Sequence, residues 1–99
     1  MIEIRKTLEF EEWHENLRSK EQIQVDARLL RIQNSDHFGD AKSLGEGLGE
    51  LRWKNGWRVY FCREASTGIL LLLGGNKNAQ VKDIQKARIL LRRYAHFGD

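Results

Sequence analysis

The sequence of 99 residues contains no proline and one cysteine, and its longest apolar run is Ile69–Leu73. Without proline there is no proline-rich linker, and no repeat or low-complexity tract divides the chain. A single cysteine excludes an intrachain disulfide and a cysteine-based structural zinc site, so we interpret Cys62 as a strand residue. The apolar run is too short to cross a bilayer. We therefore expect one small cytoplasmic domain over residues 1–95, followed by a tail over 96–99.

Motifs for metal, nucleotide and nucleophilic chemistry are also missing. The three histidines, His14, His37 and His96, have no second ligand at short spacing, so no metal or cofactor is expected. The Gly74–Lys77 segment lacks the glycine spacing of a P-loop. It can still hold a phosphate, because a helix is expected to begin close behind it. No serine, histidine and acid occur in a recognisable triad spacing.

Charge is distributed unevenly along the chain. Residues 1–50 carry seven basic and eleven acidic side chains, whereas residues 51–99 carry ten basic and three acidic ones. The basic residues Arg52, Lys54, Arg58, Arg63 and Lys77 fall in one stretch that holds one acid, Glu64. A cationic surface of this kind is suited to binding phosphates.

Hydrophobic periodicity predicts an α+β domain whose helices flank a mainly antiparallel, twisted sheet. Thr7 can cap the first helix. In the second helix the expected apolar stripe is Ile23, Ala27 and Leu30, to which Val25 and Ile32 can contribute. Glycine-rich residues 34–49 are expected to form the main loop. The expected elements are a strand over 1–6, helices over 8–18 and 20–34, strands over 50–54, 57–63 and 69–73, and a helix over 80–95.

The Asn55-Gly56 pair predicts a tight β-hairpin, because both residues tolerate a positive φ. A two-residue loop would pair Trp53 with Arg58 and so separate Arg58 from the face that carries Arg52. A loop of three to five residues or a bulge would change that register. The sequence leaves both possibilities open. The apolar run Ile69–Leu73 is expected to be a central strand covered on both faces.

Guanidinium groups on such a sheet could clamp a phosphodiester while a neighbouring 2′-hydroxyl attacks it, and Trp53, Trp57 and Tyr60 could stack on bases. A plainer interpretation is that the basic residues are solvated and the tryptophans belong to the core. From the residues alone, the chain is a small basic domain for which RNA binding is one hypothesis.

Five segments of the chain have a joint spacing that is specific. They are Asp-Ala-Lys-Ser-Leu-Gly at 40–45, Glu-Leu-Arg at 50–52, Gly-Trp-Arg-Val-Tyr-Phe at 56–61, Leu-Leu-Gly-Gly-Asn-Lys at 72–77 and Gln-Val-Lys-Asp-Ile-Gln-Lys-Ala at 80–87. Together these segments resemble the RelE/ParE toxin superfamily, in its HigB-like addiction-module branch. The resemblance covers nearly the whole chain. It implies a RelE-like fold with the order strand, two helices, three strands and one helix.

The resemblance further implies a type II toxin that cleaves mRNA on the ribosome and forms a complex with a helix-turn-helix, HigA-like antitoxin. The catalytic residues it implies are Arg52, Arg58 and Lys77. The general base is left open, with Tyr94 and His96 near the C-terminus as candidates. A ParE-like gyrase poison and a non-catalytic binding module are the alternatives. Residues expected to bind the substrate are Lys42, Lys54, Trp57 and Asn76.

Overall fold

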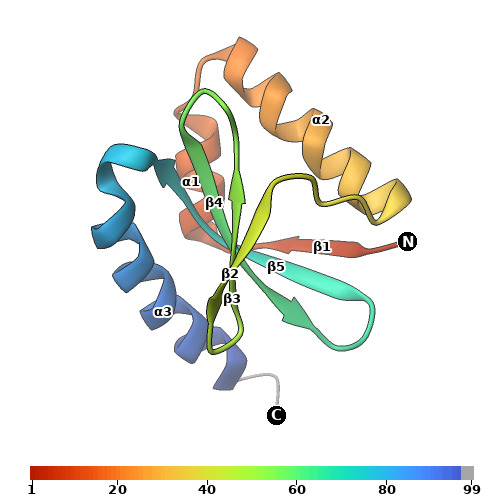
Figure 1. Cartoon of the computed structure of the whole chain (residues 1–99), viewed down its shortest axis with the longest axis vertical. Coiled ribbons are helices and arrows are strands. Elements are labelled where there is room, and N and C mark those ends of the chain that lie inside the picture. Colours follow the sequence, from red (N-terminus) through yellow and green to blue (C-terminus); the bar gives the residue numbers. More distant parts are fainter. Residues whose placement is uncertain (97–99) are drawn as a thin grey trace.

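Five strands form a single twisted sheet in the order β1-β5-β4-β3-β2, and they fan out from one point in the projection of Figure 1. The computed structural model describes residues 1–96, with side chains as far as Tyr94. Neighbouring strands are antiparallel except β1, which runs parallel to β5. The bounds are Glu3–Lys6 (β1), Ala41–Gly45 (β2), Leu48–Arg52 (β3), Trp57–Glu64 (β4) and Gly68–Asn76 (β5).

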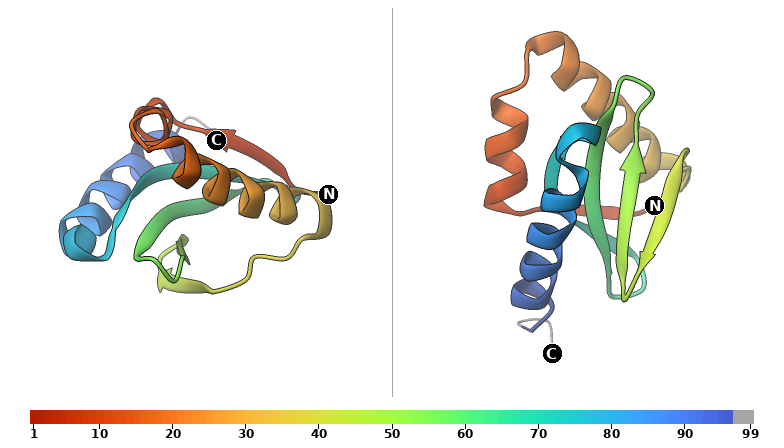
Figure 2. Two further views of the ribbon diagram at one scale, coloured as in Figure 1. Left: turned by 90° about the horizontal axis from the view of Figure 1, so that it is seen from above. Right: turned by 60° about the vertical axis from the view of Figure 1, so that its left-hand side comes forward.

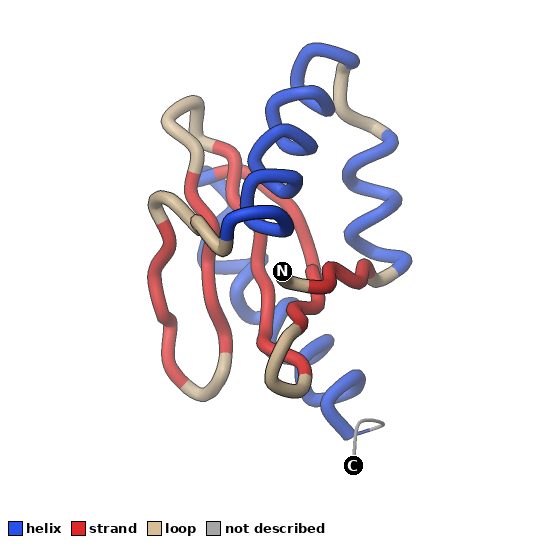
Figure 3. Tube along the Cα trace, turned by 90° about the vertical axis from the view of Figure 1, so that its right-hand side faces the viewer, coloured by secondary structure: helices blue, strands red, loops and turns tan. Residues whose placement is uncertain are grey.

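Strand β2 was not expected, because residues 34–49 were predicted to be a loop. The prediction is wrong from Ala41 onward: β2 pairs with β3, and residues Gly45, Glu46 and Gly47 make the turn between them with positive φ values. Figure 3 shows this hairpin at the edge of the sheet, away from α1. Most of β2 is exposed, so the strand has no apolar alternation and depends on pairing with β3. The domain therefore has four strands after its first two helices.

Three α-helices cover the sheet, with α1 (Leu8–Glu15) and α2 (Ser19–Ser35) on one face and α3 (Gln80–His96) on the other (Figure 2). Thr7 caps α1 as predicted: its Oγ1 accepts a hydrogen bond from the Phe10 amide at 3.0 Å and donates one to the Leu72 carbonyl at 2.7 Å. Helix α3 extends one residue past the predicted end of the domain, and residues 97–99 of the predicted tail lie outside the described residues.

Each face of the sheet has its own hydrophobic core. Strand β5 is buried on both faces from Ile69 to Leu73, which confirms that prediction, although β4 is the middle strand of the sheet. Cys62 is a buried strand residue, as expected. The α1–α2 core contains Phe10, Val25, Leu29, Ile32, Leu51, Val59, Phe61, Ile69 and Leu71, and the α3 core contains Leu48, Tyr60, Cys62, Leu70, Leu72, Leu73, Ala87 and Leu90.

The buried side of α2 differs from the predicted stripe. Ile23 and Leu30 are 68% and 56% exposed and Ala27 is also exposed, whereas the buried residues are Val25, Leu29 and Ile32. The predicted stripe is wrong because α2 carries apolar residues at helical spacing on two sides, each of which forms an apolar arc. The arc that faces the sheet is the one next to Arg28, whose guanidinium binds backbone carbonyls there.

No helix in the described part of the chain is long and apolar enough to span a membrane.

Leu71→Ala is expected to lower the free energy of unfolding by about 2 to 5 kcal/mol, because Leu71 is fully buried and the truncation leaves a cavity. Ile23→Ala, on the exposed arc of α2, is the matched control and should change it by less than about 0.5 kcal/mol. Urea unfolding followed by circular dichroism measures both. Equal losses would contradict the assigned orientation of α2.

Candidate functional site

The β3–β4 hairpin places Arg52 directly opposite Arg58. The Trp53 amide donates to the Trp57 carbonyl at 3.0 Å and closes a three-residue loop, in which Gly56 has a φ of +102°. This is the usual geometry of a three-residue hairpin, with a left-handed residue in the last loop position. The two-residue loop is therefore wrong and the longer alternative is correct. Arg52 and Arg58 share the face of the sheet that α3 covers.

Two carboxylates compensate the positive charge of Arg52. Its Nε lies 4.0 Å from an oxygen of Glu50 and 4.0 Å from an oxygen of Asp40. Arg58 donates from Nη1 to the carbonyls of Trp57 at 3.0 Å and Trp53 at 3.3 Å, which ties it to the hairpin loop. Carboxylates thus hold the Arg52 guanidinium in place, and backbone oxygens hold that of Arg58. The Arg52 side chain is 38% exposed and can reach a ligand.

Glu50 and Tyr60 lie opposite one another two pairs further along the hairpin, on the same face as the arginines. The Glu50 side chain is 1% exposed, and its Oε2 accepts a hydrogen bond from Gln80 of α3 at 2.7 Å. Burial, together with the nearby carboxylates of Glu50 and Asp83, raises the pKa of the Tyr60 hydroxyl. Tyr60 is therefore protonated at neutral pH.

Four buried polar atoms of the described side chains have no hydrogen-bond partner, and all four belong to this cluster. The Tyr60 hydroxyl and the Glu50 carboxylate lie close enough to share a hydrogen bond, so the two arginine Nε atoms are the donors that remain for a further partner. The two Nε donors are suited to an anion. The atoms are Glu50 Oε1, Arg52 Nε, Arg58 Nε and the Tyr60 hydroxyl oxygen.

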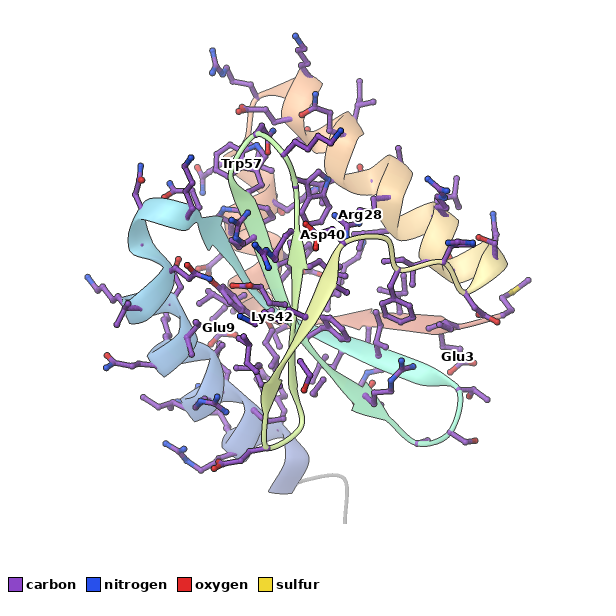
Figure 4. All side chains as sticks on the ribbon, in the orientation of Figure 1. Glu3, Glu9, Arg28, Asp40, Lys42 and Trp57 are labelled. Carbon is purple, nitrogen blue, oxygen red and sulfur yellow. The ribbon has the colours of Figure 1, made fainter. Side chains whose placement is uncertain are left out.

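Arg28 of α2 fixes the outer border of the site. Its guanidinium donates to the carbonyls of Phe38, Asp40 and Arg52, and it lies 4.4 Å from the ring centre of Trp53. Figure 4 shows Arg28 and Asp40 close together where α2 approaches the start of β2. The planar fork of arginine can bind several oxygens at once. Arg28 thereby links α2 to the strand ends that carry Arg52.

The Gly74-Gly75 pair lets two helices approach β5 closely. A Cβ at Gly74 would overlap the Trp13 ring, and a Cβ at Gly75 would overlap the carboxylate of Asp83. Because neither glycine has a positive φ, both are required for space and not for backbone conformation. Next in the chain, Asn76 Oδ1 accepts from the Asn78 amide at 2.9 Å and caps the short 3-10 helix η1 (Lys77–Ala79) that precedes α3.

The structure brings together some of the residues predicted from the sequence. Lys42, on β2 opposite Glu50, shares the face of Arg52 and Arg58 and is exposed; Figure 4 shows it over the middle of the sheet. Lys77 is exposed beside the hairpin, and its amide donates to the Gly56 carbonyl at 2.8 Å. Lys54 is exposed in the loop itself.

Other predicted residues lie elsewhere. Trp57 is on the opposite face at the hairpin tip (Figure 4). It packs edge-on against Trp13, with ring centres 5.9 Å apart. Tyr94 donates to Glu9 at 3.3 Å near the far end of α3, about 21 Å along the helix from Gln80. The structure does not bring Tyr94 to the arginine pair. The side chain of His96 lies outside the described residues.

No protein-family model matches the chain. Over 94 residues it is 40% identical to an uncharacterized protein of Haemophilus influenzae, and the match covers 90% of this chain and 92% of that protein. The chain belongs to the same family as this Haemophilus protein.

Solved structures show which fold this family has. The isolated Escherichia coli RelE toxin matches with a TM-score of 0.66 at 11% identity, over 87% of this chain and 98% of RelE. RelE in the intact RelBE toxin-antitoxin complex gives 0.65 at 13% identity, over 77% and 96%. A conserved hypothetical protein from Helicobacter pylori gives 0.51 at 12% identity, over 79% and 97%. The fold is that of RelE, as the resemblance implied, whereas membership of the RelE/ParE superfamily and of its HigB-like branch stays a prediction.

On this RelE fold, several residues of the cluster escaped the sequence analysis. Glu50 looks like an ordinary member of an alternating strand, and Gln80 and Asp83 look like ordinary residues of an amphipathic helix. Tyr60 was expected to stack on bases, which is wrong because its side chain is fully buried. The one available signal was Glu50, an acid between the apolar positions Gly49 and Leu51 of a basic hairpin. Arg28 gave no signal, because its partners are backbone carbonyls.

Arg28→Lys is expected to lower the free energy of unfolding by about 1.5 to 3 kcal/mol, because an ammonium group cannot keep the forked contacts to three carbonyls. Arg31→Lys, an exposed position on the same helix, is the matched control and should be nearly neutral. Denaturant unfolding measures the difference. Hydrogen exchange should also speed up at the Arg52 amide, which donates to the Asp40 carbonyl at 2.9 Å.

Proposed function

We propose that the protein is the toxin of a type II toxin-antitoxin system and acts as a ribosome-dependent mRNA endoribonuclease. The observation that carries this proposal is the Arg52–Arg58 pair on the α3 face of a RelE fold, with both Nε donors unpartnered. The name of the RelE neighbour, a toxin, supports the same function.

The arginine pair is suited to the charge that develops when a phosphodiester is cleaved. Attack by the 2′-hydroxyl adds negative charge to the phosphoryl oxygens, and preorganised guanidinium groups stabilise that charge without reorganising. We assign this role to Arg52 and Arg58, with Lys77 beside the hairpin as a third cation. Cleavage by these groups requires no metal.

Substrate binding extends from this pair along the exposed cations. Lys42 on the edge strand and Lys54 in the hairpin loop are both exposed and can contact the RNA backbone on either side of the cleaved bond. Trp57 and Asn76, which lie opposite each other at the ends of β4 and β5, are proposed to contact a nucleotide at the hairpin tip. A base there can stack only on the part of Trp57 that Trp13 leaves uncovered.

The partner proposed for this toxin is a small HigA-like, helix-turn-helix antitoxin that forms a hetero-oligomer with it in the cytoplasm, where ribosomes and mRNA are found. The intact RelBE complex among the structural neighbours supports an antitoxin partner. Co-expression with the protein encoded by the adjacent reading frame tests it. A stable complex and restored growth are the expected results.

Expression of the chain alone is expected to arrest growth and to produce cuts in a translated reporter mRNA, mapped by primer extension. Growth arrest with intact transcripts and DNA damage would instead indicate the gyrase-poison alternative. Normal growth without any antitoxin would indicate a binding module.

Arg58→Ala is expected to abolish mRNA cleavage and toxicity, because the lost guanidinium stabilises the transition state, while the free energy of unfolding changes by no more than about 1 kcal/mol. The small change reflects two opposing effects: two hydrogen bonds to the loop are lost, and the repulsion from Arg52 is relieved.

Arg63→Ala is the matched control, since Arg63 lies on the same strand but is exposed and stacks on Phe38, 4.9 Å from its ring centre. This variant should stay toxic. If Arg58→Ala unfolds the protein on circular dichroism, Arg58 has a structural role. If Arg63→Ala loses activity equally while both variants stay folded, the arginine pair is not the active centre.

A further inference from the structure

Asp83, in the first turn of α3, lies beside the arginine pair without belonging to it. Its carboxylate rests on Gly75, and Gly75 is the cross-strand partner of Arg58. Glycine in a strand interior costs about 0.5 to 1 kcal/mol relative to alanine, yet here it is what leaves room for the carboxylate. Gly75 therefore lowers the stability of β5, but it allows Asp83 to pack against the sheet at the cross-strand partner of Arg58.

The Asp83 side chain is only partly buried and has no hydrogen bond or ion pair with any described residue, in contrast to the other acids near the arginines. Glu50 is buried and bonded to Gln80, and the Asp40 side chain, 4.0 Å from Arg52, is 69% exposed. Asp83 alone among them combines partial burial with free oxygens. It also lines a groove of about 420 Å³ between α1 and α3, through which solvent can reach it.

A second observation points to the same place. The Glu50 carboxylate and the Tyr60 hydroxyl are buried in the cluster that adjoins Asp83, and the Asp83 carboxylate is close enough to Tyr60 to raise the pKa of its hydroxyl. Both side chains are at most 1% exposed, so neither can reach a substrate directly. Tyr94 is bonded to Glu9 away from the arginine pair. A group that exchanges a proton with a ligand held by the arginines has to be more accessible than these.

We propose that Asp83 is the general base of the reaction, accepting the proton of the 2′-hydroxyl of an RNA whose scissile phosphate is held by Arg52 and Arg58. This proposal rests on the proposed endoribonuclease function and names the proton acceptor for it. Glu50 and Tyr60 then act as positioning residues beneath the arginine pair.

The step is balanced as follows. The 2′-hydroxyl proton moves to an oxygen of Asp83, the 2′-oxygen–phosphorus bond forms, and the phosphorus–5′-oxygen bond breaks. The departing 5′-oxygen takes a proton from water, and the proton on Asp83 returns to the solvent. The products are a 2′,3′-cyclic phosphate and a 5′-hydroxyl end.

The environment of Asp83 makes its carboxylate a stronger base than that of a fully solvated aspartate. Burial raises its pKa above the ordinary value for an aspartate, although Lys86 and Lys82 lower it in part. Tyr60 of β4 lies near it, Arg58 is the cross-strand partner of the glycine beneath it, and Glu9 and Glu12 of α1 line the same groove. Since the base acts when deprotonated, activity should fall as the pH drops through this raised pKa.

Asp83→Asn tests the assignment, with Glu12→Gln as the matched control that removes one carboxylate from the other wall of the same groove. Cleavage of a translated mRNA on ribosomes gives the turnover, and fluorescence anisotropy with a 2′-deoxy-blocked RNA oligonucleotide gives the affinity. Asp83→Asn should lower turnover by about 100-fold or more, leave the affinity within about threefold, and remove the acidic limb of the pH profile. Glu12→Gln should keep that limb.

Gly75→Ala provides an independent variant, because the added methyl group displaces the carboxylate without removing its charge. It should lower turnover in the same direction. Folding of Asp83→Asn is not expected to suffer. A carboxylate whose folded pKa is raised weakens the folded state at pH values above that pKa, so the asparagine variant should be at least as stable as wild type at pH 7.

The outcomes separate the two proposals. If wild type cleaves mRNA but Asp83→Asn cleaves at the wild-type rate with the same acidic limb, the role of Asp83 is overturned and the endoribonuclease function stands. Loss of the limb in Asp40→Asn instead of Asp83→Asn would also overturn it. If wild type leaves mRNA intact under growth arrest, the endoribonuclease function fails and the role of Asp83 fails with it.

Discussion

The pairing of Arg52 with Arg58 across the β3–β4 hairpin is the constraint on which the rest of the site depends. It exists because the loop has three residues and Gly56 takes up the positive φ that ends it. A shift of one residue would turn one arginine toward the α1–α2 core, since side chains alternate between faces along a strand. The same register places Glu50 opposite Tyr60 and Arg58 opposite Gly75. One turn thus determines which groups can act together.

Such a concentration of like charge has to be stabilised by its surroundings. Asp40 and the buried Glu50 flank Arg52, and Gln80 orients Glu50 from the other layer of the domain. Arg28 holds the backbone on which Asp40 and Arg52 lie. The unpartnered atoms that remain destabilise the fold locally, and the hydrophobic cores on both faces of the sheet compensate for this. Functional sites commonly break such local rules while the rest of the structure keeps them.

The sequence predicted well the elements whose apolar pattern has a single interpretation, such as the doubly buried Ile69–Leu73 strand and the helix after Thr7. It failed where burial was weak or ambiguous. Strand β2 is mostly exposed, and α2 offered two apolar arcs, so Ile23 seemed as suitable for the core as Val25. The Asn55-Gly56 pair fits loops of two or three residues, so the hairpin was found but its register was not. Contacts from different layers, as at Asp83, have no local signature.

The Gly74-Gly75 pair illustrates why position in the fold matters more than motif. In the sequence it suggested a weak phosphate loop, because glycines before a helix leave backbone amides accessible. In the structure each glycine admits one side chain, the Trp13 ring on one face and the Asp83 carboxylate on the other. Strand β5 therefore has no side chain on either face beside Arg58, and α1 and α3 both approach the strand closely there. The two helices enclose the groove in which Asp83 is partly buried. This partial burial raises the pKa of Asp83 above that of a fully solvated aspartate.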